Sequence, residues 1–281
     1  MPAARGAAGP TFARAGRTAH RGSVRLPSFV RQLTDPLLLD LRVPVLSGRN
    51  RGRWWSLISA GSGHATGRRT AGQLALLDRL LRPGDVVWDV GAHHGFVMLT
   101  AARAVGPEGT VWAFEPSALN RAVLERHLFW NDVPNAMLLP YALADHQGED
   151  SFGGDGTSKT FRLGAGEETV QVRRGDRLIE EGMCPAPTFV KIDVEGAEAD
   201  ALAGLLPALP PSARLLIAIH DRWADRRCVE LLRTASFDLR PSAALVACRD
   251  GDWMSDPDLF SYGPTATGVE ADLELLRTSG F

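Results

Sequence analysis

The sequence predicts an open α/β fold, in which a mostly parallel sheet carries helices on both faces. Short apolar runs alternate with longer stretches whose apolar residues recur at helical spacing, which is the first observation behind the prediction. The second is the run Val86–Val90, which ends in a glycine turn before a helix-like segment from Phe96. Strand, glycine turn and helix form a unit that brings backbone N–H groups to a nucleotide-like ligand.

The elements of the main domain are expected in alternating order. A helix that carries Leu74, Leu77 and Leu81, and that Thr70 can cap, precedes the first strand. Seven strands of the sheet are expected at 86–90, 110–114, 136–141, 188–193, 214–220, 237–240 and 243–248, the last two as a closing antiparallel pair, with an excursion strand at 169–173. Helices are expected at 96–105, from Ser117, from Asp176, at 197–209 and through 229–232, whereas 148–166 is glycine-rich and poorly patterned.

Length and composition indicate a globular protein. The 281 residues allow one large domain with or without an appendage, and the 44% hydrophobic content provides a core. A net charge of −2 gives no field that would favour nucleic acid or a membrane surface, and no apolar run approaches the ~20 residues that span a bilayer. Three scattered cysteines form neither a metal motif nor a disulfide framework. We therefore expect a cytoplasmic protein in a reducing compartment, with a small-molecule partner.

Three regions are expected along the chain. No acidic residue precedes Asp35, and residues 1–28 are predicted to form a disordered leader rich in arginine and alanine, a composition that also resembles a transit peptide. Residues 29–82 are expected to form an N-terminal layer or lid with a helix, in which Trp54–Trp55 either packs on the main domain or faces a substrate. Residues 83–281 are expected to form the main domain.

Asp89 indicates which ligand the glycine turn accepts. The turn reads D-x-G-x-x-x-G from Asp89 through Gly91 to Gly95, whereas dinucleotide-binding turns carry G-x-G-x-x-G. An acid beside the turn would repel a pyrophosphate and suits a cationic ligand, such as the amino-acid end of S-adenosylmethionine. The alternative is that Asp89 only bonds the turn backbone or caps the helix.

Other polar residues follow the later strands. Glu115, which ends the second strand just before Pro116, can take both hydroxyls of a ribose with its two oxygens. Asp193 ends the fourth strand and is expected to orient the cofactor or the acceptor, since it follows an apolar run and precedes a turn. No spacing motif supports a metal site at Asp193, so none is predicted. His220 follows the fifth strand, where it is either a general base or a structural histidine.

Two further histidines, His93 and His94, lie in the glycine turn itself. Either could approach a substrate, but loop histidines more commonly satisfy backbone groups, and neither is predicted to be a base.

Taken together, these motifs resemble the FkbM family of S-adenosylmethionine-dependent methyltransferases. The resemblance covers about Pro83 to His220, half of the chain. It rests on Asp89–Val90–Gly91–Ala92 with Gly95, Ala113–Phe114–Glu115–Pro116, Tyr141–Ala142–Leu143–Ala144–Asp145, Asp176–Arg177–Leu178 and Val190–Lys191–Ile192–Asp193–Val194–Glu195–Gly196–Ala197–Glu198.

The resemblance implies a Rossmann-like class I methyltransferase fold and O-methylation of a sugar, a polyketide or another specialised metabolite. Asp193 and His220 are then the candidate catalytic residues. The residues implied around the cofactor are Asp89, Gly91, Ala92 and Gly95 at the methionine portion, Glu115 and Pro116 at the ribose, Ala142 and Asp145 around the adenine, and Asp193.

Two departures from the family pattern keep other functions open. Members commonly have Asn at the position of His93, and many have Glu at the position of Ala218. The loss of that Glu favours a degenerate module that binds cofactor without transferring a methyl group. A nicotinamide-dependent reductase is a further alternative, which Asp89 and the missing G-x-G-x-x-G disfavour.

Overall fold

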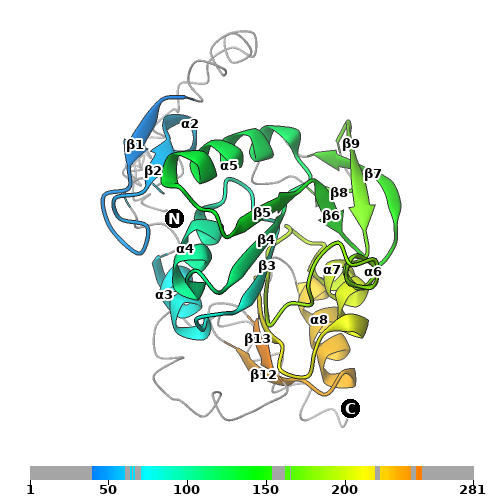
Figure 1. Cartoon of the computed structure of the whole chain (residues 1–281). Helices are drawn as coiled ribbons and strands as arrows, with labels where there is room; N and C mark the ends of the chain where they lie inside the picture. The colour runs from blue at the N-terminus through cyan, green and yellow to red at the C-terminus, as the bar shows by residue number, and fades with distance from the viewer. Residues whose placement is uncertain are drawn as a thin grey trace, which may run out of the picture. The chain divides into compact units, whose positions relative to one another are not determined.

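The computed structural model describes residues 40–60, 64, 66, 71–153, 162–164, 166–218, 222–241 and 245–248 (Figure 1). All of them belong to one unit of the chain, Leu37–Phe281. The expected leader at 1–28, the capping residue Thr70 and the candidate base His220 lie outside the described residues.

The central sheet has seven strands, as the sequence predicts. Its spatial order is β12-β13-β11-β10-β3-β4-β5. The five strands from β11 to β5 are parallel, and β13 and β12 join antiparallel at one edge, so the expected closing pair is confirmed. The strand bounds are β3 Val86–Val90, β4 Thr110–Phe114, β5 Ala136–Leu139, β10 Phe189–Ile192, β11 Arg214–Ile217, β12 Asp238–Pro241 and β13 Leu245–Cys248.

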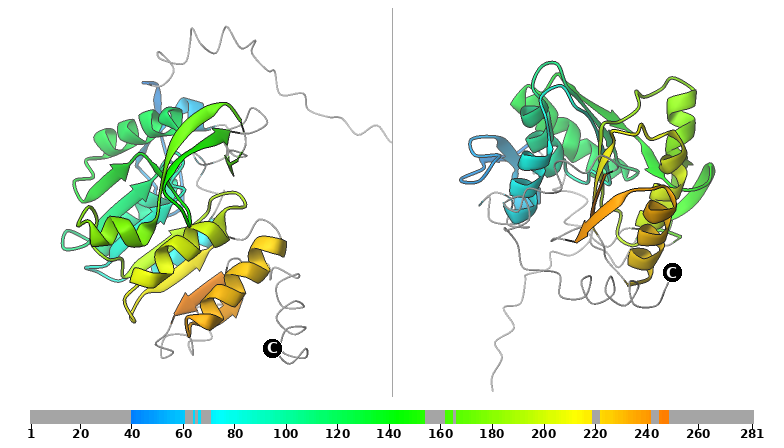
Figure 2. Two further views of the ribbon diagram at one scale, coloured as in Figure 1. Left: turned by 90° about the vertical axis from the view of Figure 1, so that its right-hand side faces the viewer. Right: turned by 90° about the horizontal axis from the view of Figure 1, so that it is seen from below.

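Helices cover both faces of this sheet (Figures 1 and 2). Because successive side chains of a strand point to opposite faces, Val87 of β3 packs in one core and Trp88 in the other. The first core lies under α3 (Ala71–Leu80), α4 (Phe96–Val105) and α5 (Ala118–Asn131). The second lies under α6 (Gly175–Glu180), α7 (Glu198–Leu205) and α8 (Arg222–Thr234), with the short 3-10 turn Leu206–Ala208 after α7 at Pro207.

A second sheet of four strands was not expected from the sequence. The strand expected at 136–141 stops at Leu139, since Pro140 has no N–H to donate, and the chain resumes as a strand of another sheet. This sheet has the order β6-β9-β7-β8, so part of the poorly patterned segment is strand. The excursion strand at 169–173 is confirmed as most of β9. The bounds are β6 Tyr141–Leu143, β7 Gly148–Gly153, β8 Arg162–Leu163 and β9 Glu168–Arg173.

The described part of the expected N-terminal layer is a hairpin beside α5 (Figure 1). It consists of β1 (Arg42–Pro44), β2 (Trp54–Ser56) and the short α2 (Leu57–Ala60). Trp54 is 37% exposed, whereas Trp55 is fully buried and stacks on His127 of α5 at a centroid distance of 3.8 Å. Trp55 therefore packs on the main domain, and it also lines the cavity described below.

Candidate functional site

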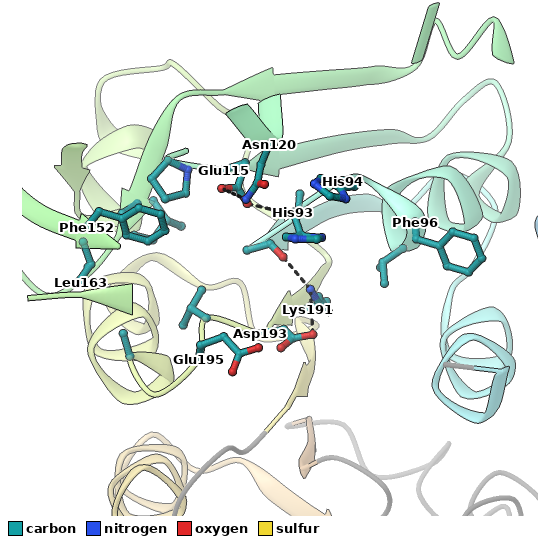
Figure 3. Close-up of a pocket in the computed structure, with 18 of the residues that line it drawn as sticks. His93, His94, Phe96, Glu115, Asn120, Phe152, Leu163, Lys191, Asp193 and Glu195 are labelled. Atoms are coloured by element: carbon teal, nitrogen blue, oxygen red, sulfur yellow. Dashed lines mark hydrogen bonds and ion pairs between the residues drawn. The ribbon is translucent and has the colours of Figure 1, made fainter. Parts of the chain in front are cut away.

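A cavity of about 230 Å³ opens at the carboxyl edge of the parallel strands (Figure 3). This is where open α/β sheets bind their ligands. Its wall is built from the turn after β3, the segments after β4 and β10, the second sheet, and the hairpin. The lining residues used below are Trp55, Gly91, Ala92, His93, His94, Glu115, Pro116, Asn120, Ala142, Leu143, Phe152, Leu163, Lys191, Asp193 and Glu195.

The turn after β3 is held in place by close packing. Gly91 has a φ of +78°, and a Cβ built on it would lie 2.1 Å from the carbonyl oxygen of Asp193. The N–H groups of Gly91 and Ala92 both donate to the carbonyl of Phe114 at the end of β4, at 3.0 and 3.1 Å. Gly95, with a φ of +83°, is the N-cap residue just before α4. The turn therefore joins the ends of β3, β4 and β10, and only glycine fits at position 91.

Glu115 presents a fixed carboxylate to the cavity. Its Oε2 accepts the backbone N–H of His93 at 2.7 Å, and its Oε1 accepts the N–H of Ser117 at 3.0 Å and Nδ2 of Asn120 at 3.1 Å. Burial raises the pKa of Glu115, and these hydrogen bonds oppose that rise. Three of roughly four lone pairs of the carboxylate are used, so Oε2 can accept one more hydrogen bond.

Asn120 adds a second acceptor beside Glu115. Asn120 is 2% exposed, and its Oδ1 makes no hydrogen bond of good geometry among the described residues, although its side chain interacts with His94. A buried amide oxygen that lines a cavity without such a hydrogen bond fits a ligand that donates hydrogen bonds. Together Glu115 and Asn120 fit the two hydroxyls of a ribose.

On the opposite side of the cavity, Lys191 of β10 joins two carboxylates (Figure 3). Its Nζ lies 3.1 Å from Oδ1 of Asp89 and 3.4 Å from Oδ2 of Asp193, and it donates to the carbonyl of Gly91 at 3.1 Å. Asp89 is fully buried beneath the turn and is not part of the cavity wall. Asp193 is part of that wall, with its side chain 28% exposed. We call these three residues the Asp89–Lys191–Asp193 cluster.

Burial and the neighbouring charges act in opposite directions on the pKa values of Asp89 and Lys191. Burial raises the pKa of Asp89, and the charge of Lys191 opposes this rise. Burial alone would lower the pKa of Lys191, but Asp89 and Asp193 together raise it above its ordinary value. Lys191 therefore stays charged at neutral pH.

Some of the other predicted site residues line the cavity, and one does not. Pro116 and Ala142 lie on the cavity wall, whereas Asp145 does not. Asp145 is exposed and pairs with His146 at 3.2 Å and with Arg227 at 3.5 Å. The apolar end of the cavity is instead formed by Ala142, Leu143, Phe152 and Leu163.

Of the two histidines in the glycine turn, His94 has the more closely described contacts, with His93, Ser59 and His127. The rings of the two turn histidines lie 3.8 Å apart, and Nδ1 of His94 is 2.9 Å from the hydroxyl of Ser59. Burial, together with the neighbouring histidines, lowers the pKa of His94 to about 2. The carbonyl of His94 lies 2.7 Å from Nδ1 of His127, which ties the turn to α5.

Sequence reasoning missed Lys191 and Asn120 as site residues. Lys191 did carry a signal, because a lysine inside the apolar run Phe189–Ile192 is a charge that needs a buried partner. Asn120 carried none, since asparagine in the first turn of a helix is ordinary.

Among the described residues, no group of three or more His, Cys, Asp or Glu side chains is arranged to hold a metal ion. In the same part of the chain, no helix has the length and apolar character to cross a membrane.

A parallel sheet with helices on both faces, and a glycine turn beside a cavity at its carboxyl edge, define a Rossmann-like protein. The comparison with protein families is more specific. Residues 89–238, just over half of the chain, match the methyltransferase FkbM domain. The protein belongs to the FkbM methyltransferase family.

Three relatives share this part of the chain. The hexuronic acid methyltransferase AglP of Haloferax volcanii is 34% identical over 158 residues, which cover 54% of this chain and 62% of AglP, less than two thirds of its length. The 31-O-demethyl-FK506 methyltransferase FkbM of Streptomyces tacrolimicus is 34% identical over 194 residues, covering 56% of this chain and 74% of that protein. The 2-O-methyltransferase NoeI of Sinorhizobium fredii is 25% identical over 198 residues, which cover 61% of this chain and 77% of NoeI.

Proposed function

We propose that this protein is an S-adenosylmethionine-dependent O-methyltransferase that acts on a hydroxyl of a small molecule, such as a sugar, a polyketide or another specialised metabolite. The observation that carries the proposal is the placement of Glu115 and Asn120, two acceptors that face one cavity beside the glycine turn. Family membership and the names of the three relatives support the methyl-transfer chemistry.

The residues of the cavity have distinct roles in this proposal. Glu115 and Asn120 accept the ribose hydroxyls, and the apolar end at Phe152 and Leu163 packs on the adenine. The turn at Gly91 and the carboxylate of Asp193 hold the methionine portion. When bound, the cofactor supplies a methyl group on a positively charged sulfur.

Methyl transfer forms a bond between the acceptor oxygen and the methyl carbon and breaks the bond between that carbon and sulfur, whose electron pair stays on the sulfur. The acceptor oxygen loses its proton. The protein contributes mainly alignment of oxygen, carbon and sulfur. Asp193 reaches the cavity and can take the proton there, and His220, outside the described residues, remains a prediction for the same role.

Calorimetric titration with S-adenosylhomocysteine, with NADH and NADPH in parallel, tests the cofactor. We expect micromolar binding of the first ligand and none of the other two. Glu115→Gln should weaken binding of S-adenosylhomocysteine at least tenfold, because an amide nitrogen replaces one carboxylate oxygen and leaves at least one of the three N–H groups that hold Glu115 without an acceptor. Glu125→Gln, an exposed acid on α5, is the matched control. Binding of nicotinamide nucleotides alone would overturn the proposal.

The alternative of a module that binds cofactor without catalysis is favoured by Ala218. The N–H of Ala218 donates to the carbonyl of Ile192 at 2.8 Å and so extends the pairing of β11 with β10. The alanine side chain offers no polar group to a methyl-acceptor substrate. Transfer of a labelled methyl group to any hydroxylated compound would exclude this alternative, whereas cofactor binding alone would not.

We further propose a cytoplasmic location. Cys184 is a buried free cysteine, as expected in a reducing compartment.

A further inference from the structure

We propose that the imidazole of His93 binds the carboxylate of the amino-acid end of S-adenosylmethionine, and that this contact makes the cavity selective for a cofactor that carries the carboxylate. The inference rests on the proposed function and deepens it, because it assigns a role to a side chain on the cavity wall that has none so far.

The glycine turn places His93 between the two acidic ends of the cavity. Since β3 lies between β4 and β10 in the sheet, the turn that follows β3 lies between Glu115 and Asp193. Figure 3 shows His93 on this turn, with Glu115 on one side and Asp193 on the other. A nucleoside whose ribose lies at Glu115 must therefore carry the substituent of its 5′ carbon past His93 to reach Asp193.

The conformation of His93 is held by its neighbours. Its backbone N–H donates to Oε2 of Glu115 at 2.7 Å, and its ring lies 3.8 Å from the ring of His94, which Ser59 contacts in turn. His93 has a φ of +52°, in the left-handed region that favours glycine and asparagine. Such strained positions gather at ligand-binding sites, where the surroundings maintain them.

The charges around the cavity restrict where a carboxylate can bind. Glu115, Asp193 and Glu195 all line the wall, and each, where ionised, repels a carboxylate and attracts the ammonium group of the same ligand. Lys191 is positive, but within the Asp89–Lys191–Asp193 cluster its three N–H donors already have three oxygen partners. The carboxylate therefore needs another donor.

Three imidazoles on the described part of the wall can supply that donor, those of His64, His93 and His94. Burial lowers the pKa of His94 to about 2, so this ring is neutral. The ring of His64 packs against Trp55 and Phe96, at 5.5 and 4.6 Å between centroids. His93 extends from the turn that the amino-acid end must cross, and an imidazole can donate from a ring nitrogen whether it is neutral or protonated.

The test compares S-adenosylhomocysteine with S-(5′-adenosyl)-3-thiopropylamine, which lacks only the carboxylate. Calorimetry gives both dissociation constants, with displacement titration for the weaker ligand. The measured quantity is the ratio of the Kd of the analogue to the Kd of S-adenosylhomocysteine. His93→Phe keeps an aromatic ring beside His94 but has no N–H, so it should lower this ratio about tenfold.

His93→Gly protects the test against strain in the turn, because glycine adopts a φ of +52° freely. It should lower the ratio as much as His93→Phe does. His146→Phe makes the same chemical change on the surface, where the side chain of His146 is 50% exposed. Both dissociation constants should then stay within about twofold of those of the original protein.

An unchanged ratio in either His93 variant would overturn the inference, since a residue that only supports the turn weakens both ligands equally. A fall in the ratio confined to His64→Phe would assign the carboxylate to His64 and overturn it as well. If the original protein binds neither ligand, the proposed function fails instead.

Discussion

Two acidic side chains at the carboxyl edge of the sheet, Glu115 and Asp193, are positioned by groups from neighbouring segments. The N–H of His93, in the turn after β3, donates to Glu115 after β4. Lys191 contacts Asp193 and at the same time donates to the carbonyl of Gly91. Both carboxylates are therefore oriented before a ligand arrives, and this preorganisation lowers the entropic cost of binding.

Gly91→Ala is expected to abolish measurable binding of S-adenosylhomocysteine. The added Cβ would lie 2.1 Å from the carbonyl oxygen of Asp193, so either the turn or the end of β10 must move. Calorimetry measures the affinity, and circular dichroism checks that the fold is retained.

Gly84→Ala is the matched control for backbone strain. Gly84 also has a left-handed φ, +83°, but an added Cβ would meet nothing within 4 Å. Gly84→Ala should cost about 1 kcal/mol of stability and leave the affinity unchanged. Equal affinities of the two variants would show that the packing of Gly91 on Asp193 is not needed for binding.

At the scale of elements, His127 of α5 connects the N-terminal hairpin to the glycine turn. Its Nε2 accepts the N–H of Ser56 at 2.8 Å, and its Nδ1 donates to the carbonyl of His94 at 2.7 Å. Since a backbone N–H can only donate and a carbonyl can only accept, the ring is the neutral tautomer with the proton on Nδ1. The hairpin thus contacts the glycine turn through this imidazole, in addition to lining the cavity with Trp55.

His127→Phe should destabilise the protein by about 2–4 kcal/mol and weaken binding of S-adenosylhomocysteine several-fold. Phenylalanine keeps the stacking on Trp55 but leaves one buried N–H and one buried carbonyl without a partner. Urea unfolding and calorimetry give the two quantities. Phe129→Ala, on the same helix and 84% exposed, should change stability by less than about 0.5 kcal/mol. Unchanged affinity in His127→Phe would separate the hairpin from the function of the site.

The element boundaries show what sequence patterns could predict. The buried runs at β3, β4 and β10 are apolar except for Asp89, Thr110 and Lys191 and are bounded by turns, so the main sheet was predictable. The second sheet was not, because β7 reads GEDSFG, and its pairing with β9 depends on tertiary contact rather than on local pattern.

At the scale of the whole molecule, the candidate site could be predicted only in part. Glu115 and Asp193 follow apolar strands, and parallel strands end at one edge, so their meeting in one cavity followed from the sequence. Lys191 contacts Asp89 because β10 lies beside β3 in the sheet. Lys191 and the glycine turn that it also contacts, at Gly91, are 100 residues apart in the sequence. Sequence order does not specify that neighbour.

A buried ion pair lies at the opposite, amino edge of the sheet. Asp85, just before β3, pairs with Arg214 of β11 at 2.5 Å and accepts the hydroxyl of Thr188 at 2.7 Å. Asp85→Asn should cost about 3 kcal/mol, because it leaves a buried guanidinium without its counter-charge. Urea unfolding measures the loss, and the affinity for S-adenosylhomocysteine should not change.

The exposed pair of Asp78 with Arg49 provides the comparison. Its atoms lie 2.9 Å apart, but the Arg49 side chain is 52% exposed. Asp78→Asn should therefore cost less than about 1 kcal/mol. A loss of equal size in both variants would mean that burial of the Asp85 pair adds nothing.

Two buried imidazoles make the free energy of unfolding depend on pH. Burial lowers the pKa of His94 to about 2 and that of His127 to about 4, from 6.5. Between those values and 6.5 the unfolded chain binds more protons, so this stability is fully present above pH 6.5 and is lost as the pH falls. Burial raises the pKa of Asp89 and Glu115, and these carboxyls act in the opposite direction.

As the pH falls from 7 to 5, each imidazole is expected to lower the free energy of unfolding by about 2 kcal/mol. The carboxyls of Asp89 and Glu115 offset part of this loss. Urea unfolding at both pH values should show this loss. His127→Phe should lose about 2 kcal/mol less than the original protein over the same interval, because one of the two imidazoles is gone. Phe129→Ala retains both and should follow the original pH dependence. An equal loss in His127→Phe would show that His127 takes up its proton without leaving its place between Ser56 and His94.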